Sequence, residues 1–198
     1  MKEFWDERYA AKEYVYGREP NEFLRSRLDK LSPGRMLLPG EGEGRNAVYA
    51  ASRGWDVLAF DQSETGKAKA LQLAKEKGVA IDYRTGSLLD IKIEPGTIDL
   101  VGLVYFHLLP EVRTKYHAYL ANILAQGGMI IMEVFSKKQI NNESGGPKDL
   151  QLLYSLDDIL QDFDGLEVLY ASEESVHLDE GPFHQGMAEV IRLAAQKA

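Results

Sequence analysis

Residues 35–61 read RMLLPGEGEGRNAVYAASRGWDVLAFD, and two short apolar runs in this stretch flank a glycine-rich turn and a helical pattern. The first run covers residues 36–38 and leads into a turn with a glycine at every second position, namely Gly40, Gly42 and Gly44. The second run covers residues 57–60 and ends on Asp61. The pattern predicts a strand, a glycine turn, a helix, a second strand and a terminal carboxylate, in that order.

This arrangement is typical of a nucleoside-binding site. Glycines have no Cβ atom, so the backbone can turn sharply and approach a ligand closely. A helix that begins near Gly44 would point unsatisfied N–H groups at a ligand over the turn. A carboxylate at the end of the second strand, here Asp61, can accept hydrogen bonds from both hydroxyls of a ribose.

Two classes of nucleoside compete for this turn, the dinucleotides and S-adenosylmethionine (SAM). The dinucleotide fingerprint is G-x-G-x-x-G, whereas residues 40–44 form G-x-G-x-G. Glu41 and Glu43 flank the central glycine, and a pyrophosphate would meet like charges there. A cationic sulfonium with an ammonium group nearby is favoured instead, so the turn indicates SAM.

The same residues resemble the motifs of a known enzyme class. Residues 37–46, Asp61 and the run at 98–101 resemble those of the class I SAM-dependent methyltransferases. More narrowly, GEGRN at 42–46 with HLLP at 107–110 resembles the small bacterial group of tellurite-resistance and thiopurine methyltransferases. The resemblance implies a Rossmann-like core with a seven-stranded, mostly parallel sheet, its last strand inserted antiparallel, and an N-terminal helical lid.

The resemblance also implies a set of cofactor-binding residues. From the core it takes Gly40, Glu41, Gly42, Gly44, Asn46, Asp61, Gln62, Ser87, Leu88 and Val104, and from the lid Trp5, Tyr9 and Tyr16. One position departs from the class, because Leu38 stands where most members carry an acid that helps to hold the amino-acid end of the cofactor. Either Glu41 or Glu43 is expected to replace that acid.

Length and composition limit the organisation and the partners. A chain of 198 residues that is 44% hydrophobic predicts a single domain, residues 1–198, with a helical cap at 1–34 and a core at 35–198. A net charge of −8 argues against nucleic acid and against an anionic membrane surface. Without cysteine, without a long apolar run and without an apolar signal core, the chain is expected to be soluble and cytoplasmic.

The rest of the chain alternates between helical and strand patterns. Helices are expected at residues 22–31, 64–77, 110–125 and 156–163, and further strands at 79–83, 98–104 and 129–135. Apolar runs at 166–171 and 187–193 predict a closing antiparallel pair. Such alternation specifies an α/β doubly wound sheet.

Asp99 and the polar stretch at 136–149 are two further positions at which the sequence makes a prediction. Asp99 lies inside an apolar strand, where an unpaired carboxylate would be costly, so it is expected to accept backbone N–H groups near the glycine turn. The polar stretch at 136–149 is long for a loop in a compact domain and is expected to be functional or mobile.

Aromatic residues are crowded ahead of the glycine turn, within residues 4–16. One interpretation is a helix that covers the core, because aromatic residues at helical spacing often pack. The other is a lid whose Trp5, Tyr9 or Tyr16 faces the sulfonium, since a cation over an aromatic ring gains about 0.5 to 2 kcal/mol. The resemblance favours the lid.

The acceptor side is predicted from chain topology. Ligands bind outside the carboxyl ends of parallel strands, so Val104 and Tyr105, at the end of the fourth strand, are expected to line the transfer site. His184 lies in a glycine-framed loop, EGPFHQG at 180–186, of the kind that carries function. Tyr105 and His184 are therefore the candidate catalytic residues. The four histidines have no metal-binding spacing, and His107 is interpreted as a packed residue.

Three functional hypotheses follow. The first is a SAM-dependent methyltransferase that acts on a small soluble acceptor such as a thiol or a reduced chalcogen. The second is an NAD(P)-dependent oxidoreductase, although the third-glycine spacing is missing and Tyr105 is followed four residues later by leucine, not lysine. The third is a non-catalytic SAM-binding protein.

Overall fold

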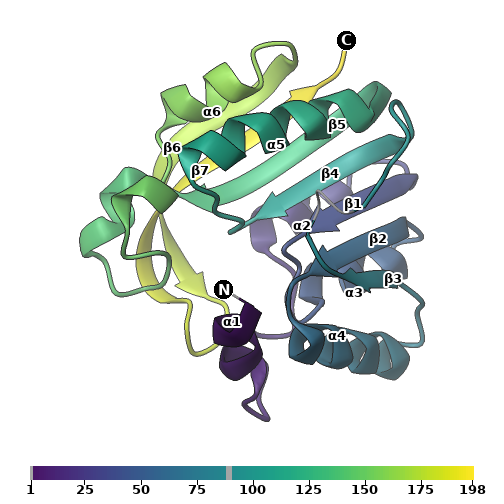
Figure 1. The fold of residues 1–198 in the computed structure, drawn as a ribbon, viewed down its shortest axis with the longest axis vertical. Helices are drawn as coiled ribbons and strands as arrows, with labels where there is room; N and C mark the ends of the chain where they lie inside the picture. The colour runs from purple at the N-terminus through teal and green to yellow at the C-terminus, as the bar shows by residue number, and fades with distance from the viewer. Residues whose placement is uncertain (1, 88–90) are drawn as a thin grey trace. The chain divides into compact units, whose positions relative to one another are not determined.

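The computed structural model describes residues 2–87 and 91–198 (Figure 1). It divides into two compact units. The first unit comprises Met1–Ile93 and Glu180–Phe183, and the second comprises Glu94–Asp179 and His184–Ala198. Leu88, one of the predicted cofactor-binding residues, lies outside the described residues.

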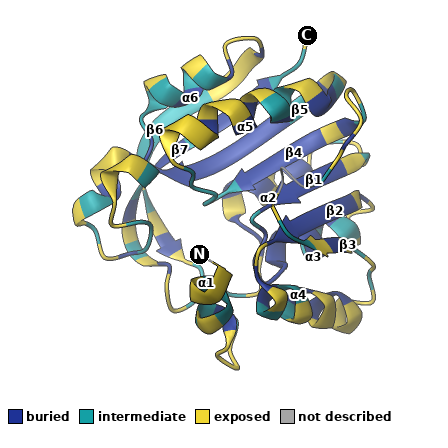
Figure 2. Ribbon diagram, viewed as in Figure 1, coloured by how far each residue is buried: buried dark blue, intermediate teal, exposed yellow. Residues whose placement is uncertain are grey.

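The first unit is built on three parallel strands. These are β1 (Arg35–Pro39), β2 (Asp56–Asp61) and β3 (Asp82–Thr85). Leu37 of β1 lies opposite Leu58 of β2, and Phe60 of β2 lies opposite Arg84 of β3. Every residue of β1 and β2 after the first is buried, as a parallel strand covered on both faces requires (Figure 2).

The described residues of the first unit form four α-helices. They are α1 (Lys2–Tyr9), α2 (Glu22–Leu28), α3 (Arg45–Ser52) and α4 (Glu64–Lys77). Asn21 and Ser63 cap α2 and α4 as expected, because their side chains accept the N–H groups of Leu24 and Gly66. Helices α3 and α4 pack against β2, and α1 packs against α4.

The second unit contains β4 (Ile98–Val104), α5 (Pro110–Ile123), β5 (Leu124–Phe135), α6 (Leu156–Asp162), β6 (Glu167–Asp179) and β7 (Gln185–Gln196). Helices α5 and α6 lie over the same face of its strands (Figure 1). The capping box before α6 is present in both directions, between Ser155 and Asp158. Strand β5 begins at Leu124, five residues earlier than the sequence pattern indicates.

The seven strands form one sheet in the order β3-β2-β1-β4-β5-β7-β6. Strand β5 pairs with β4 in parallel and with β7 antiparallel, and β6 pairs with β7 antiparallel. The predicted doubly wound, mostly parallel α/β sheet with an inserted antiparallel last strand is thus confirmed. The closing hairpin is confirmed as well, and both of its strands are longer than their apolar runs.

Asp99 is exposed on β4, so the argument from the cost of burying its carboxylate is wrong. The stretch at 136–149 begins with the 3-10 helix η2 (Lys137–Asn141). Its fully buried Gln139 donates to the Ser144 hydroxyl at 2.9 Å and accepts the Glu189 N–H at 2.8 Å. A second 3-10 helix, η3 (Leu150–Leu152), leads on to α6.

Candidate functional site

The glycine turn joins β1 to α3 at the carboxyl end of β1. Gly40, Gly42 and Gly44 have φ angles of +63°, +58° and +85°, a region that side chains disfavour. The Gly42 N–H donates to Asp61 Oδ2 at 3.1 Å, and the Tyr83 hydroxyl donates to the Gly42 carbonyl at 2.6 Å. The turn is therefore held from β2 and β3, and its shape depends on the missing Cβ atoms.

Asp61 ends β2 beside the turn, as its place in the sequence predicts. Its second oxygen accepts the Ser63 N–H at 2.9 Å, and burial raises the pKa of the carboxyl. A carboxylate offers about four lone-pair sites, and the Gln62 backbone N–H is a third partner of Asp61, so the carboxylate retains capacity for a further donor. Two hydroxyls on adjacent carbons are suitable donors for that capacity.

Glu41 points back to the start of α3. Its carboxylate accepts the Ala47 N–H at 2.7 Å and the Asn46 side-chain amide at 3.3 Å, and it is 8% exposed. The first of these contacts satisfies an orphan N–H group of the first helical turn. Burial nevertheless raises the pKa of Glu41 from 4.5 to about 7. Among the described residues, no cation forms an ion pair with this carboxylate.

Glu43 points the other way, toward the N-terminal segment, which we define as residues 2–20. Its carboxylate accepts the N–H groups of Val15 at 2.8 Å and Tyr16 at 3.4 Å, and it forms an ion pair with Lys69. The Lys69 amine also lies 2.9 Å from the carbonyl oxygen of Ala11 and 2.6 Å from that of Glu13. The two glutamates of the turn thus have different partners, and Glu43 already has a cation.

The N-terminal segment packs directly on the glycine turn. Tyr9 is buried, and a Cβ atom built on Gly42 would lie 2.5 Å from the Tyr9 hydroxyl oxygen. Trp5 stacks on Tyr9 with ring centroids 5.5 Å apart, and Tyr16 meets Tyr9 edge-on at 6.3 Å. Asp6 of α1 accepts the Ser63 hydroxyl at 2.6 Å. The three aromatic residues predicted for a lid are brought together over the turn.

Asn46 uses both ends of its side chain within the protein. Its oxygen accepts the Asn21 N–H at 2.9 Å, and its amide donates to Glu41. Its buried neighbour Arg45, which sequence reasoning missed, forms an ion pair with Glu180 at 3.0 Å. The sequence carries a partial signal for Arg45, because Arg45 belongs to the GEGRN motif together with Asn46. It carries no signal for Glu180, the distant partner of Arg45.

In the second unit, Tyr105 directly follows β4 and has a φ angle of +50°. Its ring stacks on Phe135 at 4.6 Å and meets His184 edge-on at 4.5 Å, so the two predicted catalytic residues are in contact. The Tyr105 hydroxyl donates to Glu133 at 2.7 Å, and Arg192 donates to the other Glu133 oxygen. Sequence reasoning missed buried Glu133, although an acid inside the apolar run of β5 is a visible signal.

His107 is a packed residue, as interpreted from the sequence. Its Nδ1 lies 2.7 Å from the Leu152 carbonyl oxygen, and its Nε2 lies 3.4 Å from the Phe135 nitrogen. The neutral Nδ1–H tautomer satisfies both contacts, donating to the first and accepting from the second. Burial lowers the pKa of His107 to about 4.

The remaining predicted residues differ in exposure. Gln62 and Ser87 are exposed in the first unit, and Val104 is half-buried at the end of β4. Among the described residues, no group of three histidine or acidic side chains is arranged to hold a metal ion. Within the same residues, no helix has both the length and the apolar character that crossing a bilayer requires.

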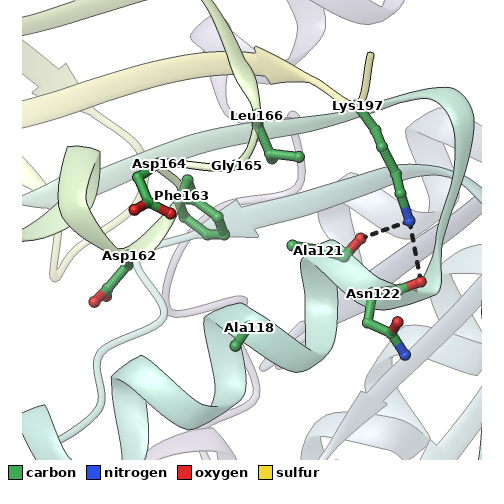
Figure 3. A pocket seen from close by; sticks show the side chains of 9 residues that line it. All are labelled: Ala118, Ala121, Asn122, Asp162, Phe163, Asp164, Gly165, Leu166 and Lys197. Carbon is green, nitrogen blue, oxygen red and sulfur yellow. Dashed lines mark hydrogen bonds between the residues drawn. The ribbon is translucent and has the colours of Figure 1, made fainter.

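A separate cavity of about 370 Å³ lies in the second unit between the ends of α5 and α6 (Figure 3). Lys197 borders it, and its amine donates to the carbonyls of Ala121 at 3.1 Å and Asn122 at 3.3 Å. The cavity lies near the start of β5, whereas Tyr105 lies beside the last residue of that strand, Phe135. None of the predicted site residues lines it.

Part of the chain matches a known protein family. Residues 37–128, which include the glycine turn, Asp61 and Tyr105, match the family model described as a methyltransferase domain. A search of curated proteins finds no matching sequence.

Solved structures share the fold at low sequence identity. TehB from Haemophilus influenzae is 15% identical, with a TM-score of 0.74 over 100% of this chain and 67% of that chain. The magnesium protoporphyrin IX methyltransferase ChlM from Synechocystis PCC 6803, solved with bound SAH, is 16% identical, with a TM-score of 0.72 over 100% and 97%. A protein solved in a study of disulfide-to-thioacetal conversion during echinomycin biosynthesis is 17% identical, with a TM-score of 0.79 over 100% and 92%.

These likenesses confirm the Rossmann-like methyltransferase fold. The match to a methyltransferase domain supports SAM as the cofactor.

Proposed function

We propose that the protein is a SAM-dependent methyltransferase that transfers a methyl group to a small soluble acceptor in the cytoplasm. The observation that carries the proposal is the first unit's glycine turn, which ends a parallel strand beside Asp61 and lies within the part of the chain that matches a methyltransferase domain. The turn disfavours a dinucleotide, because its spacing is G-x-G-x-G and because the Glu41 carboxylate, which has no ion pair among the described residues, would oppose a pyrophosphate.

The cofactor roles follow from the contacts of the turn. Asp61 takes the ribose hydroxyls with its remaining lone pairs, and Gly42 lets the backbone approach the nucleoside. Glu41 is the better candidate for the acid missing at Leu38, because Glu43 already has an ion pair with Lys69, whereas no described cation forms an ion pair with Glu41. An arriving ammonium would return the pKa of Glu41 toward its ordinary range, since a nearby cation favours the ionised carboxylate.

For methyl transfer, the main task of the protein is to align the cofactor with the acceptor. Methyl transfer from a sulfonium is an in-line displacement whose donor is already activated, so holding the two reactants in line and excluding water supply most of the rate. Trp5, Tyr9 and Tyr16 serve as the lid that excludes water.

On the acceptor side we assign Tyr105 and His184. The Tyr105 hydroxyl directs its proton at a carboxylate, Glu133, so Tyr105 is suited to orienting the acceptor with its ring and not to removing a proton. His184 contacts that ring and is the candidate base where an acceptor needs one. The motif resemblance to the tellurite-resistance and thiopurine group, together with the shared fold of TehB, supports a thiol or a reduced chalcogen as the acceptor.

Calorimetry with the purified protein tests the cofactor. We expect SAM and S-adenosylhomocysteine to bind and NADPH not to bind; binding of NADPH without a response to SAM would favour the oxidoreductase hypothesis instead. Methylation of a panel of thiols, tellurite and selenite tests the activity. Binding of SAM with no methylation of any acceptor would favour a non-catalytic SAM-binding protein.

The His184→Ala variant tests how the acceptor is activated. A soft nucleophile relies on alignment, so we expect a loss of about 10- to 100-fold, whereas an acceptor that needs deprotonation should lose about 10²- to 10⁴-fold. Tyr105→Phe keeps the ring and removes the hydrogen bond to Glu133, so it serves as the matched variant. Full activity in both variants would show that the acceptor binds elsewhere.

A further inference from the structure

Four residues of the hairpin between β6 and β7 belong to the first unit. Glu180–Phe183 lie there, although β6 and β7 themselves belong to the second unit. The first unit therefore holds a piece of chain from the far end of the sequence, and the contacts of this piece show which part of the unit it holds.

An ion pair anchors the piece beside the glycine turn. Arg45, the first residue of α3 after Gly44, donates to Glu180 Oε2 at 3.0 Å, and the two side chains are only 7% and 13% exposed. The Asn21 side-chain amide donates to the other Glu180 oxygen at 3.2 Å. An ion pair this far from water needs both partners, because removal of one leaves an uncompensated buried charge.

The residues after Glu180 contact the backbone of the N-terminal segment. Gly181 has a φ angle of +84°, and a Cβ atom built on it would lie 2.4 Å from the Gly17 nitrogen. The Phe183 N–H donates to the Val15 carbonyl at 3.4 Å, and the Arg8 guanidinium lies 4.5 Å from the centre of the Phe183 ring. A side chain at position 181 would not fit without moving one of the two backbones.

Val15 is consequently held from two sides. Its N–H donates to Glu43 of the glycine turn, and its carbonyl accepts from Phe183. The N-terminal segment that covers the turn is thus a middle layer between Glu43 and the Glu180–Phe183 piece. Removal of the outer contact, which joins Glu180–Phe183 to the segment, would leave the contacts of the segment with the turn, with α4 and with Arg45 of α3.

The outer contact, between Glu180–Phe183 and the N-terminal segment, is expected to open at a low cost in free energy. Phe183 is 45% exposed and Pro182 is also exposed, so the piece buries little apolar surface and depends on polar contacts. Regions with few buried apolar contacts open locally at low free energy. The ion pair is the part of this contact that is well shielded from water.

We propose that Glu180 is a positioning residue for the cofactor site, which through Arg45 and Asn21 keeps the N-terminal segment closed over the nucleoside. The inference rests on the proposed function and extends it to a residue that touches neither cofactor nor acceptor. His184, the candidate base, directly follows Phe183 in the chain. Release of Glu180 would therefore also loosen Phe183, the residue next to that base.

The test compares Glu180→Gln with wild type in two measurements. Hydrogen exchange of residues 13–17 is followed by mass spectrometry with and without S-adenosylhomocysteine, and the dissociation rate of that ligand is measured by stopped flow. Glutamine keeps the size and an acceptor oxygen but removes the charge. We expect exchange at Val15 and Tyr16 at least tenfold faster, and ligand dissociation at least tenfold faster.

Two further variants complete the design. Glu173→Gln makes the same charge change on β6, where Glu173 pairs with largely exposed Lys138, and should match wild type in both measurements. Gly181→Ala pushes the same contact apart without a charge change, so it replaces Glu180→Gln if that variant does not fold. Wild-type exchange and dissociation rates in a folded Glu180→Gln or Gly181→Ala variant would overturn the inference.

Failure of the proposed function gives a different result. If wild type does not bind S-adenosylhomocysteine, the proposed function is wrong, while exchange in the ligand-free proteins still decides whether Glu180 holds the segment. Glu180→Gln could instead show faster hydrogen exchange with an unchanged dissociation rate of S-adenosylhomocysteine. That result would mean that Glu180 has only a structural role, and it would also overturn the inference.

Discussion

Replacement of Glu41 by glutamine should separate the stability of the protein from its affinity for the cofactor. Burial raises the pKa of Glu41 from 4.5 to about 7. Because one pKa unit corresponds to about 1.4 kcal/mol, the folded state disfavours the ionised carboxyl by about 3 kcal/mol. Glutamine has nearly the same shape, carries no charge and still offers an oxygen to the Ala47 N–H.

The sign of the pH dependence follows from the direction of the pKa change. The folded pKa lies above the unfolded one, so between pH 4.5 and about 7 the folded state binds more protons, and the contribution of Glu41 to stability falls as pH rises. We expect Glu41→Gln to raise the free energy of unfolding by up to about 3 kcal/mol at pH 8 and to change it little at pH 4.5.

Urea denaturation at several pH values measures this effect as the difference between variant and wild type. The wild-type curve alone is not diagnostic, because His107 has a pKa lowered to about 4 and its contribution changes in the opposite direction over the same range. Glu43→Gln is the control, since it removes the partner of Lys69 and should destabilise the protein at pH 8. A Glu41→Gln variant less stable than wild type at pH 8 would refute the reasoning.

The same variant should bind SAM more weakly, by about tenfold or more, if Glu41 pairs with the ammonium of the cofactor. Stability and affinity would then change in opposite directions on one substitution. Unchanged affinity in calorimetry would transfer the role of the missing acid away from Glu41.

Further outcomes are expected at four other positions. Asp61→Ala should cost about 1 to 3 kcal/mol of SAM affinity, because charge-assisted hydrogen bonds to the ribose are lost, and unchanged affinity in calorimetry would place the ribose elsewhere. Gly44→Ala should destabilise the protein by about 2 to 4 kcal/mol in urea, since its Cβ atom would lie 2.4 Å from that of Ala70 at a φ angle of +85°. Gly78→Ala, with φ +69° and open space around it, should cost only about 1 kcal/mol, and equal losses in the two variants would contradict the steric argument. His107 should remain the neutral Nδ1–H tautomer in nitrogen NMR down to about pH 5, and its contribution to stability should be lost as pH falls from 6.5 toward 4; protonation near pH 6.5 would show that the ring is not held as described.

Much of the architecture could be predicted because its signals are local. The caps at Ser63 and Ser155 and the glycine turn each depend on residues within a few positions of one another, and all occur as expected. The early start of β5 could not be predicted from periodicity, because the pairing of Leu124 with Ile98 of β4 extends this strand back through a polar, glycine-containing stretch. Exposed Asp99 shows that an apolar run alone does not specify burial of every residue in a strand.

The candidate site was predictable where it is contiguous in sequence and not where it is assembled from distant parts. Asp61 and Gly42 are 19 positions apart and could be paired by the order of strand, turn and strand. Glu180 and Arg45 are 135 positions apart, and nothing in either neighbourhood indicates the other. The split roles of Glu41 and Glu43 were also hidden, because alternate residues of a turn point in different directions only once the backbone is fixed.

Tyr105 limits how readily the acceptor side could be altered, in nature or by design. Within the described part of the chain it is the only non-glycine residue with a positive φ, a conformation that costs an ordinary side chain about 1 to 2 kcal/mol. Glycine, asparagine and aspartate tolerate that backbone best, but none of them would rebuild the ring contacts with Phe135 and His184. A mutant library aimed at new acceptors would therefore sample position 105 poorly, and the variation that survives should concentrate on the residues around it.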